Sequence, residues 1–309
     1  MLNVDTPKPR WGRIGQFYAI AFAGTALAGG LVAAISAGTL LRTAILAVAM
    51  FSPALASWLM LRRDGHKGLD GLAALRLSRW SVVAAAVGLA ISLLTVLIGA
   101  LLPGTTWDWQ MTGLFETLAK ALPAAELQEA KDKLLALPVH PVLLGILQAV
   151  IAGCTINAVF AFGEEVGWRG WLQRELAGLP FWRANLLVGT LWGLWHAPII
   201  WVGHNYPDHP LEGTFLFVLT CIGLSPWHAQ VRSSGGSVWA AAMLHGTINA
   251  SAGLSMLVVS GSDLIVGVPG IAGLGALAVA NVALLALRSR RPAMMSRLRA
   301  PSVPNRKPT

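Results

Sequence analysis

The stretch from Ser81 to Leu102 reads SVVAAAVGLAISLLTVLIGALL and carries no charged residue in 22 positions. A helix needs about 20 apolar residues to cross the roughly 30 Å of hydrocarbon in a bilayer. Because no water can hydrogen-bond to the backbone there, an uncharged run of this length predicts a membrane-spanning helix. The stretch therefore indicates an all-α membrane fold.

Similar apolar runs recur along the whole chain. Its 309 residues are 55% hydrophobic and 12% charged, whereas a soluble domain usually carries about twice that charged fraction. We predict about eight spans, with approximate bounds 14–36, 40–61, 81–102, 141–162, 184–202, 212–229, 237–258 and 264–287. The expected structure is a polytopic helical bundle, integral to the cell membrane and in contact with lipid on its outer faces.

One transmembrane domain is predicted, over residues 14–287. An N-terminal tail, 1–13, and a basic C-terminal tail, 288–309, flank it on the inner side. The longest connection, about 103–140, places apolar side chains at helical spacing beside charged ones. This pattern favours amphipathic helices on the outer surface, with a solvated connector as an equal alternative.

The net charge of +9 is distributed unevenly along the chain. When loops alternate sides and the N-terminus is inside, 19 of the 23 Lys and Arg residues fall on the inner side. The four on the outer side are Arg42, Lys120, Lys131 and Lys133. This positive-inside bias explains the basic charge as membrane topology, so we expect no nucleic-acid partner.

Two adjacent carboxylates, Glu164 and Glu165, lie in the segment GEEVGWRG that follows an apolar run. Successive helical residues point about 100° apart, so the two glutamates are expected to have different roles. Glu165 and Arg169 are four residues apart and can form an ion pair, which leaves Glu164 to face a cavity. The alternative is an inner-surface helix end whose charges are solvated.

Two histidines fall within predicted spans. His196 follows Gly189 and Gly193, whose spacing favours close helix packing. His245 and Asn249 are four residues apart and project from one helix face. Polar groups in hydrocarbon must find partners, so these side chains are expected to converge with Glu164. The remaining histidines fall in predicted loops or at span ends and are expected to be solvated: His66, His140, His204, His209 and His228.

Three motifs follow one another along the chain in an order that resembles the CAAX-protease and bacteriocin-processing (CPBP) family. They are Glu164-Glu165-x-x-x-Arg169, Trp192-x-x-x-His196 and His245-x-x-x-Asn249. These intramembrane metalloproteases include the type II CAAX prenyl endopeptidases. The resemblance covers about 140–260, where we place the peptidase core. One departure is visible, because the second motif usually begins with Phe and here begins with Trp192.

The resemblance implies that Glu164 activates a water for attack on a peptide carbonyl, in a cavity of the bundle. His196, His245 and Asn249 would surround it, with structural support from Glu165, Arg169 and Trp192. The implied partner is a peptide or protein substrate at the membrane. Zinc could be held by Glu164, His196 and His245, but a metal-free mechanism would use the same residues.

Two other functions remain open from the sequence. A proton-coupled transporter would explain ionisable groups inside the membrane, but it would not explain the order of the three motifs. An immunity-type binder that keeps the fold without turnover is the second alternative. The intact set of Glu164, His196, His245 and Asn249 argues against such a loss.

We predict an even number of spans with both termini on the inner side, because an odd number would invert the basic asymmetry. Reporter fusions at Lys8 and after Arg299 should therefore report the same side of the membrane. Reporters found on opposite sides would show that the predicted set of spans is wrong.

Overall fold

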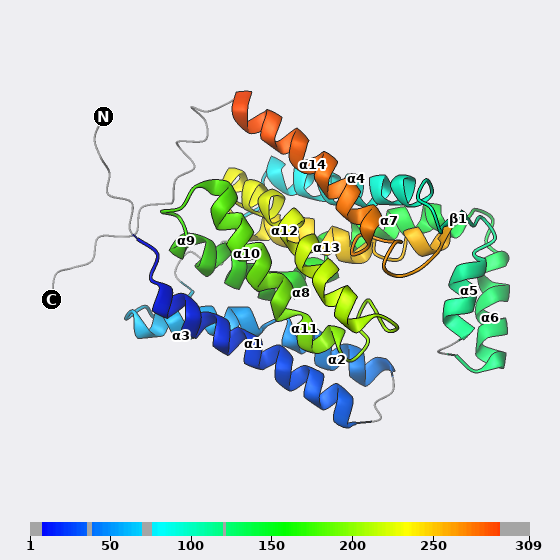
Figure 1. Ribbon diagram of the computed structural model, residues 1–309, viewed down its shortest axis with the longest axis horizontal. Coiled ribbons are helices and arrows are strands. Elements are labelled where there is room, and N and C mark those ends of the chain that lie inside the picture. Colours follow the sequence, from blue (N-terminus) through cyan, green and yellow to red (C-terminus); the bar gives the residue numbers. More distant parts are fainter. Residues whose placement is uncertain (1–7, 36–38, 70–75, 120–121, 291–309) are drawn as a thin grey trace.

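The computed structural model describes residues 8–35, 39–69, 76–119 and 122–290, and these form a bundle of helices with two very short strands (Figure 1). The all-α class predicted from the apolar runs is confirmed. The predicted C-terminal tail lies outside the described residues from position 291 onward, as do residues 1–7 of the N-terminal tail.

Five described helices are long and apolar enough to cross a membrane. They are α1 (Trp11–Ala34), Leu40–Arg63, α4 (Arg79–Gly99), α12 (Pro210–Gly235) and α14 (Ile271–Arg290). The span Leu40–Arg63 combines α2 (Thr39–Ala49) with α3 (Ser52–Arg63). A further pair, α7 (Pro141–Cys154) followed by Ile156–Glu175, passes the same test with a bend of 49°. The chain is thus a multi-pass membrane protein.

Eight spans were predicted, whereas five described helices, or six with the bent pair, meet this criterion of length and hydropathy. The predicted spans 184–202 and 237–258 contain α10 (Phe181–Trp195) and α13 (Val238–Ala250), which have only 15 and 13 residues. At 1.5 Å per residue such helices are about 20 to 22 Å long, less than the hydrocarbon thickness. α10 stops at Trp195, and α11 (Ala197–Ile200) begins a new short helix with Pro198 in its first turn.

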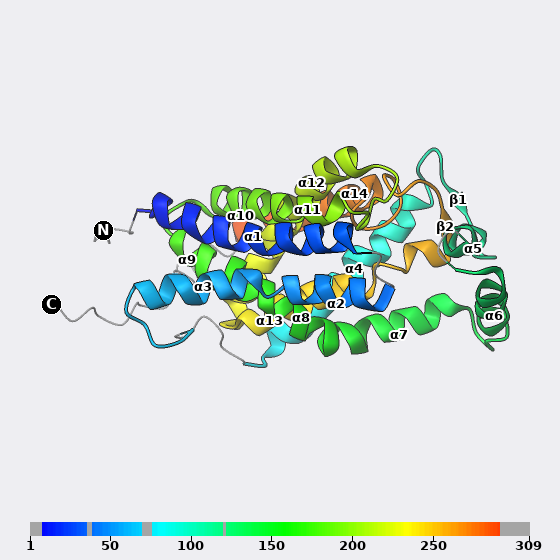
Figure 2. The same cartoon turned by 90° about the horizontal axis from the view of Figure 1, so that it is seen from below.

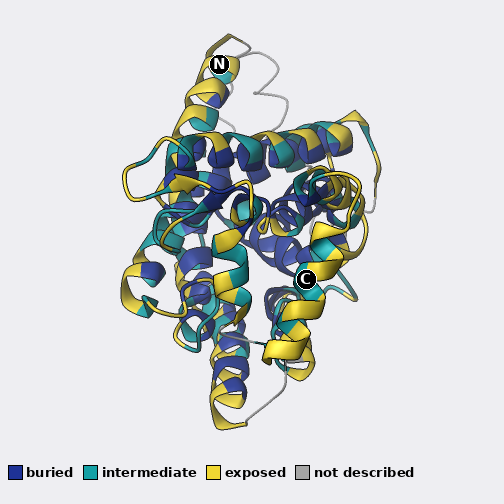
Figure 3. Cartoon of the chain, turned by 90° about the vertical axis from the view of Figure 1, so that its right-hand side faces the viewer, coloured by how far each residue is buried: buried dark blue, intermediate teal, exposed yellow. Residues whose placement is uncertain are grey.

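The outer faces of the bundle expose large apolar side chains. Leu40, Val82 and Val282 are 86%, 71% and 68% exposed. Such faces would be costly in water and suit contact with lipid. Viewed along the bundle, the buried residues lie toward the centre and the exposed ones on the outer turns (Figure 3).

Glycines allow both short helices to approach their neighbours closely, and α13 is buried along most of its length, whereas α10 still exposes Leu186 and Leu194. α13 contacts α4, α7, α8 (Ile156–Glu165) and α12, while α10 packs along α12 (Figure 1). A Cβ at Gly193 would lie 2.5 Å from the Cα of Val218, and one at Gly246 would lie 2.3 Å from the carbonyl oxygen of Gly153. Both positions therefore require glycine, and both bring motif-bearing helices against their neighbours.

A small unit projects from the end of the bundle opposite the start of α1 (Figure 2). It contains β1 (Thr106–Trp107), α5 (Thr112–Ala119) and α6 (Ala124–Leu135), and β1 pairs antiparallel with β2 (Val259–Ser260) after η2 (Ser255–Leu257). Neither α5 nor α6 contains a buried residue. The predicted helices of this connection are present, and their position at the outer membrane surface stays a prediction.

Candidate active site

Glu164 and Glu165 end α8 at the point where the chain changes to a π-helix, η1 (Val166–Leu172). The short α9 (Gln173–Glu175) follows. All seven residues of η1 are buried. π-Helical turns are rare and are found mostly at functional sites, because they rotate side chains out of the regular helical order. The first motif is therefore held in unusual backbone geometry inside the bundle.

Glu164 is held at one oxygen only. Its Oε2 accepts a hydrogen bond of 2.7 Å from Nε1 of Trp192, the aromatic residue that begins the second motif. The other oxygen, Oε1, accepts no hydrogen bond among the described residues. Glu164 also keeps 2% of its surface exposed, whereas Glu165 has none. A phenylalanine at position 192 could not make this bond, since it has no donor.

Glu165 forms the ion pair with Arg169 that their spacing predicted, at 3.0 Å and with both side chains fully buried. The same Oε1 also accepts from Nδ1 of His245 at 3.0 Å. Arg169 in turn donates to Ser225 Oγ at 3.3 Å and lies 4.3 Å above the ring of Trp192. Glu165 thus joins η1, α13, α12 and α10, while its neighbour Glu164 is left free of ion pairs.

His228 was predicted to be solvated, and this is wrong. Its side chain is fully buried, and Nε2 lies 4.0 Å from Oε1 of Glu165. The predicted span ended at 229, but α12 continues to Gly235, so His228 lies within the helix. The apolar residues Ala229 and Val231, both buried, were the available signal that the helix continues.

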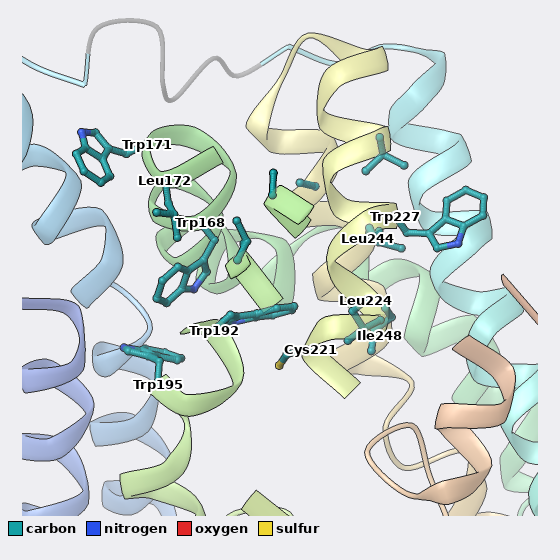
Figure 4. Close-up of a cluster of buried hydrophobic side chains, with 14 of the residues drawn as sticks. Trp168, Trp171, Leu172, Trp192, Trp195, Cys221, Leu224, Trp227, Leu244 and Ile248 are labelled. Atoms are coloured by element: carbon teal, nitrogen blue, oxygen red, sulfur yellow. The ribbon is translucent and has the colours of Figure 1, made fainter. Parts of the chain in front are cut away.

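His196 contacts the same centre through Trp192. Its Nδ1 donates to the carbonyl oxygen of Trp192 at 2.8 Å, and its ring packs edge-on to Trp195 and obliquely against Phe217. The ring of Trp192 lies 5.3 Å from those of both His228 and His245. In Figure 4, Trp192 lies among Trp168, Trp195 and Cys221. Trp192 is therefore the common neighbour of Glu164 and the three histidines.

Asn249 lies apart from these groups. It is exposed and its side chain makes no hydrogen bond with the described residues, although it is one turn beyond His245 on α13. The structure thus brings together Glu164, Glu165, Arg169, Trp192 and the three histidines His196, His228 and His245. It does not bring Asn249 into contact with them.

Glu165, His228 and His245 could hold a metal ion, because one ligand atom from each lies within 4.8 Å of the others. Two imidazoles and a carboxylate are typical zinc ligands. Oε2 of Glu165 and Nε2 of His228 are also buried, with no hydrogen-bond partner in the described part of the chain. This group shares only His245 with the zinc set expected from the sequence, which was Glu164, His196 and His245.

We predict that Glu165→Ala and Arg169→Ala each lower the free energy of unfolding by about 3 to 5 kcal/mol, because either change leaves a buried charge unpaired. The double variant should lose less than the sum of the two. Thermal unfolding in detergent measures all three, with Lys133→Ala as the control because its ion pair with Glu129 is exposed. Wild-type melting of both single variants would contradict the structural role of this pair.

Comparison with known proteins agrees with the three motifs. Residues 138–251, which contain all of them, match the family model described as type II CAAX prenyl endopeptidase Rce1-like. A stretch of 44 residues is 41% identical to CAAX prenyl protease 2 of Methanococcus maripaludis, and it covers 14% of this chain and 16% of that protein. Residues 138–251 thus form an Rce1-like domain of the CPBP family, as the motifs predicted.

Proposed function

We propose that this protein is an intramembrane endopeptidase in which Glu164 activates the attacking water. The observation that supports this most directly is the unequal environment of its two oxygens. Trp192 holds Oε2, while Oε1 is left to accept a proton. A positioned carboxylate in a largely water-free site suits general-base catalysis.

His196 would orient the same water. Its Nδ1 is fixed by the carbonyl oxygen of Trp192, so in the neutral ring Nε2 is an acceptor. His245 donates from Nδ1 to Glu165 at 3.0 Å. We propose that His245 acts in its protonated form, in which both ring nitrogens carry a hydrogen: Nδ1 donates to Glu165, and Nε2 donates to the negative charge that develops on the peptide carbonyl oxygen.

Asn249 would act later than the other residues. Its side chain is exposed, one helical turn beyond His245. We therefore propose that its amide donates to the substrate backbone or to the developing oxyanion once a peptide is bound. The substrate would be a membrane-associated peptide or protein, which is the class expected for an Rce1-like protease.

The proposed reaction needs no resident metal. Arg169 already neutralises Glu165 at 3.0 Å, so a divalent cation beside this carboxylate would meet a buried positive charge. The donor types suit zinc, but the local charge opposes it. If zinc were bound to Glu165, His228 and His245, it would act as a Lewis acid on the carbonyl.

We predict that Glu164→Gln abolishes cleavage and keeps the fold, because Gln retains the size and accepts the Trp192 hydrogen bond but cannot take a proton. Peptides from membranes that contain wild-type or variant protein, compared by mass spectrometry, give the measurement. Glu126→Gln, on the exposed face of α6, is the matched control and should match wild type. Near wild-type cleavage by Glu164→Gln would refute the mechanism and favour a transporter or a binder.

We also predict full activity after prolonged dialysis against a zinc chelator, and less than one bound metal per purified chain by elemental analysis. His228→Ala should leave the metal content unchanged. Stoichiometric zinc that is lost together with activity in His228→Ala and His245→Ala would instead establish a metal site at these residues.

A further inference from the structure

An open pocket of about 510 Å³ lies between the start of α2 and the loop 201–209, which joins α11 to α12 (Figure 1). Arg42 and Leu46 of α2 line it, together with loop residues between Trp201 and Pro207. None of the lining residues belongs to the three motifs, and none is acidic. The pocket lies at the end of the bundle where α1 ends and α2 begins, which the predicted topology places on the outer side. It is therefore built from residues that the candidate active site does not use.

The loop is shaped around the guanidinium group of Arg42. Nη2 of Arg42 donates to the carbonyl oxygen of Val202, which ties α2 to the loop. Gly203 has a φ of +90°, a conformation that side chains rarely adopt, and a Cβ there would lie 3.3 Å from the same Nη2. The loop therefore needs glycine at this position to turn beside Arg42, and the guanidinium group is fixed at the wall of the pocket.

Arg42 has hydrogen-bond donors to spare and no counterion within the described residues. A guanidinium group carries five N–H donors, and the bond to Val202 uses one of them. Arg42 forms no ion pair with a described residue, and no acid lines the pocket. Residues 36–38, which precede α2 and lie outside the described structure, are Ser, Ala and Gly and carry no charge. The half-buried positive charge at the pocket is thus available to an anion.

His204 provides a second polar group in the same pocket. Its side chain is half-buried and makes no hydrogen bond with the described residues, while its backbone N–H donates to the carbonyl oxygen of Ile199 at 3.1 Å. Burial and the nearby Arg42 guanidinium lower the pKa of His204, so the ring is neutral at neutral pH. A neutral ring offers one N–H donor without adding a second charge beside Arg42. The two side chains can thus donate hydrogen bonds to one oxyanion.

The pocket opens at a surface that suits lipid. Trp201 lines it and is 62% exposed, and Leu40 and Leu41 at the start of α2 are exposed as well. An indole is favoured where hydrocarbon meets the headgroup region, because its ring is apolar and its N–H is polar. A lipid in contact with this surface places its acyl chains against the leucines and its headgroup beside Arg42.

Guanidinium groups bind phosphate oxyanions in bidentate fashion, and basic pockets between membrane helices bind lipid headgroups. We propose that this pocket binds the headgroup of an anionic phospholipid. Arg42 and His204 donate to the phosphate, and the rest of the pocket, which is larger than a phosphate needs, holds the alcohol of the headgroup. The inference goes beyond the proposed endopeptidase function and does not depend on it.

A carboxylate of a peptide substrate is the competing anion, and the position of the pocket argues against it. The lining residues include neither Glu164 nor any of the three histidines of the candidate active site. The exposed apolar side chains at the opening lie on the surface of the bundle, where lipid would contact them. A lipid headgroup therefore reaches Arg42 from the membrane without crossing the bundle.

The test compares two lipids that share acyl chains and differ in headgroup charge. The full chain in detergent is titrated with phosphatidylglycerol or with phosphatidylcholine, and bound lipid is counted by native mass spectrometry. We expect phosphatidylglycerol to bind about tenfold more tightly, as for a charge-assisted hydrogen bond. Arg42→Gln should remove this preference, because Gln can still donate to Val202 but carries no charge, and Arg42→Lys should retain part of it.

Arg63→Gln is the matched control, because Arg63 is exposed at the opposite end of the span Leu40–Arg63 and donates to Gln16. It should keep the full preference for phosphatidylglycerol. His204→Leu is a second test variant, since this side chain has no hydrogen bond to lose within the described structure. It should melt like wild type without lipid and bind phosphatidylglycerol about fivefold more weakly. If Arg42→Gln lowers the melting temperature without lipid, His204→Leu decides, and unchanged binding by that variant overturns the proposal.

Three other results would overturn the proposal. One is equal binding of the two lipids by the wild-type protein. Another is an unchanged preference for phosphatidylglycerol in a stably folded Arg42→Gln variant. The third is an Arg42-dependent rise in melting temperature with soluble glycerol phosphate, or with a peptide carboxylate, that equals the rise with phosphatidylglycerol. That result would assign the pocket to a soluble anion instead of a lipid.

Discussion

The buried ion pair between Glu165 and Arg169 is the constraint on which the rest of the centre depends. Both side chains are fully buried, and each makes a second polar contact, to His245 and to Ser225. Because an unpaired charge in this environment would be very costly, η1, α12 and α13 must keep their mutual positions. Trp192 of α10 adds the fourth helix by lying against Arg169 and donating to Glu164.

This pairing gives two adjacent glutamates different chemistry. Glu165 is neutralised and fixed, so it can only position its neighbours. Glu164, one residue earlier and about 100° away on the helix, accepts a single side-chain hydrogen bond from the described residues and is 2% exposed. The replacement of the usual phenylalanine by Trp192 adds a donor at this point, so the proposed base is oriented by an indole as well as by its helix.

Ion pairs also fix the end of the bundle at which α1 begins. Arg10 and Arg13 engage Asp64 and Glu175, and thereby tie α1 to α3 and α9.

The sequence by itself determined the membrane class, the three motifs and the Glu165–Arg169 pair, because hydropathy and i, i+4 spacing act within one helix. Only the tertiary structure decided which predicted spans are short internal helices, that His228 joins Glu165 and His245, and that Asn249 faces away. These features depend on where helices break and how closely they pack at glycines such as Gly193 and Gly246. Contacts between segments far apart in sequence leave no periodic signal in any one of them.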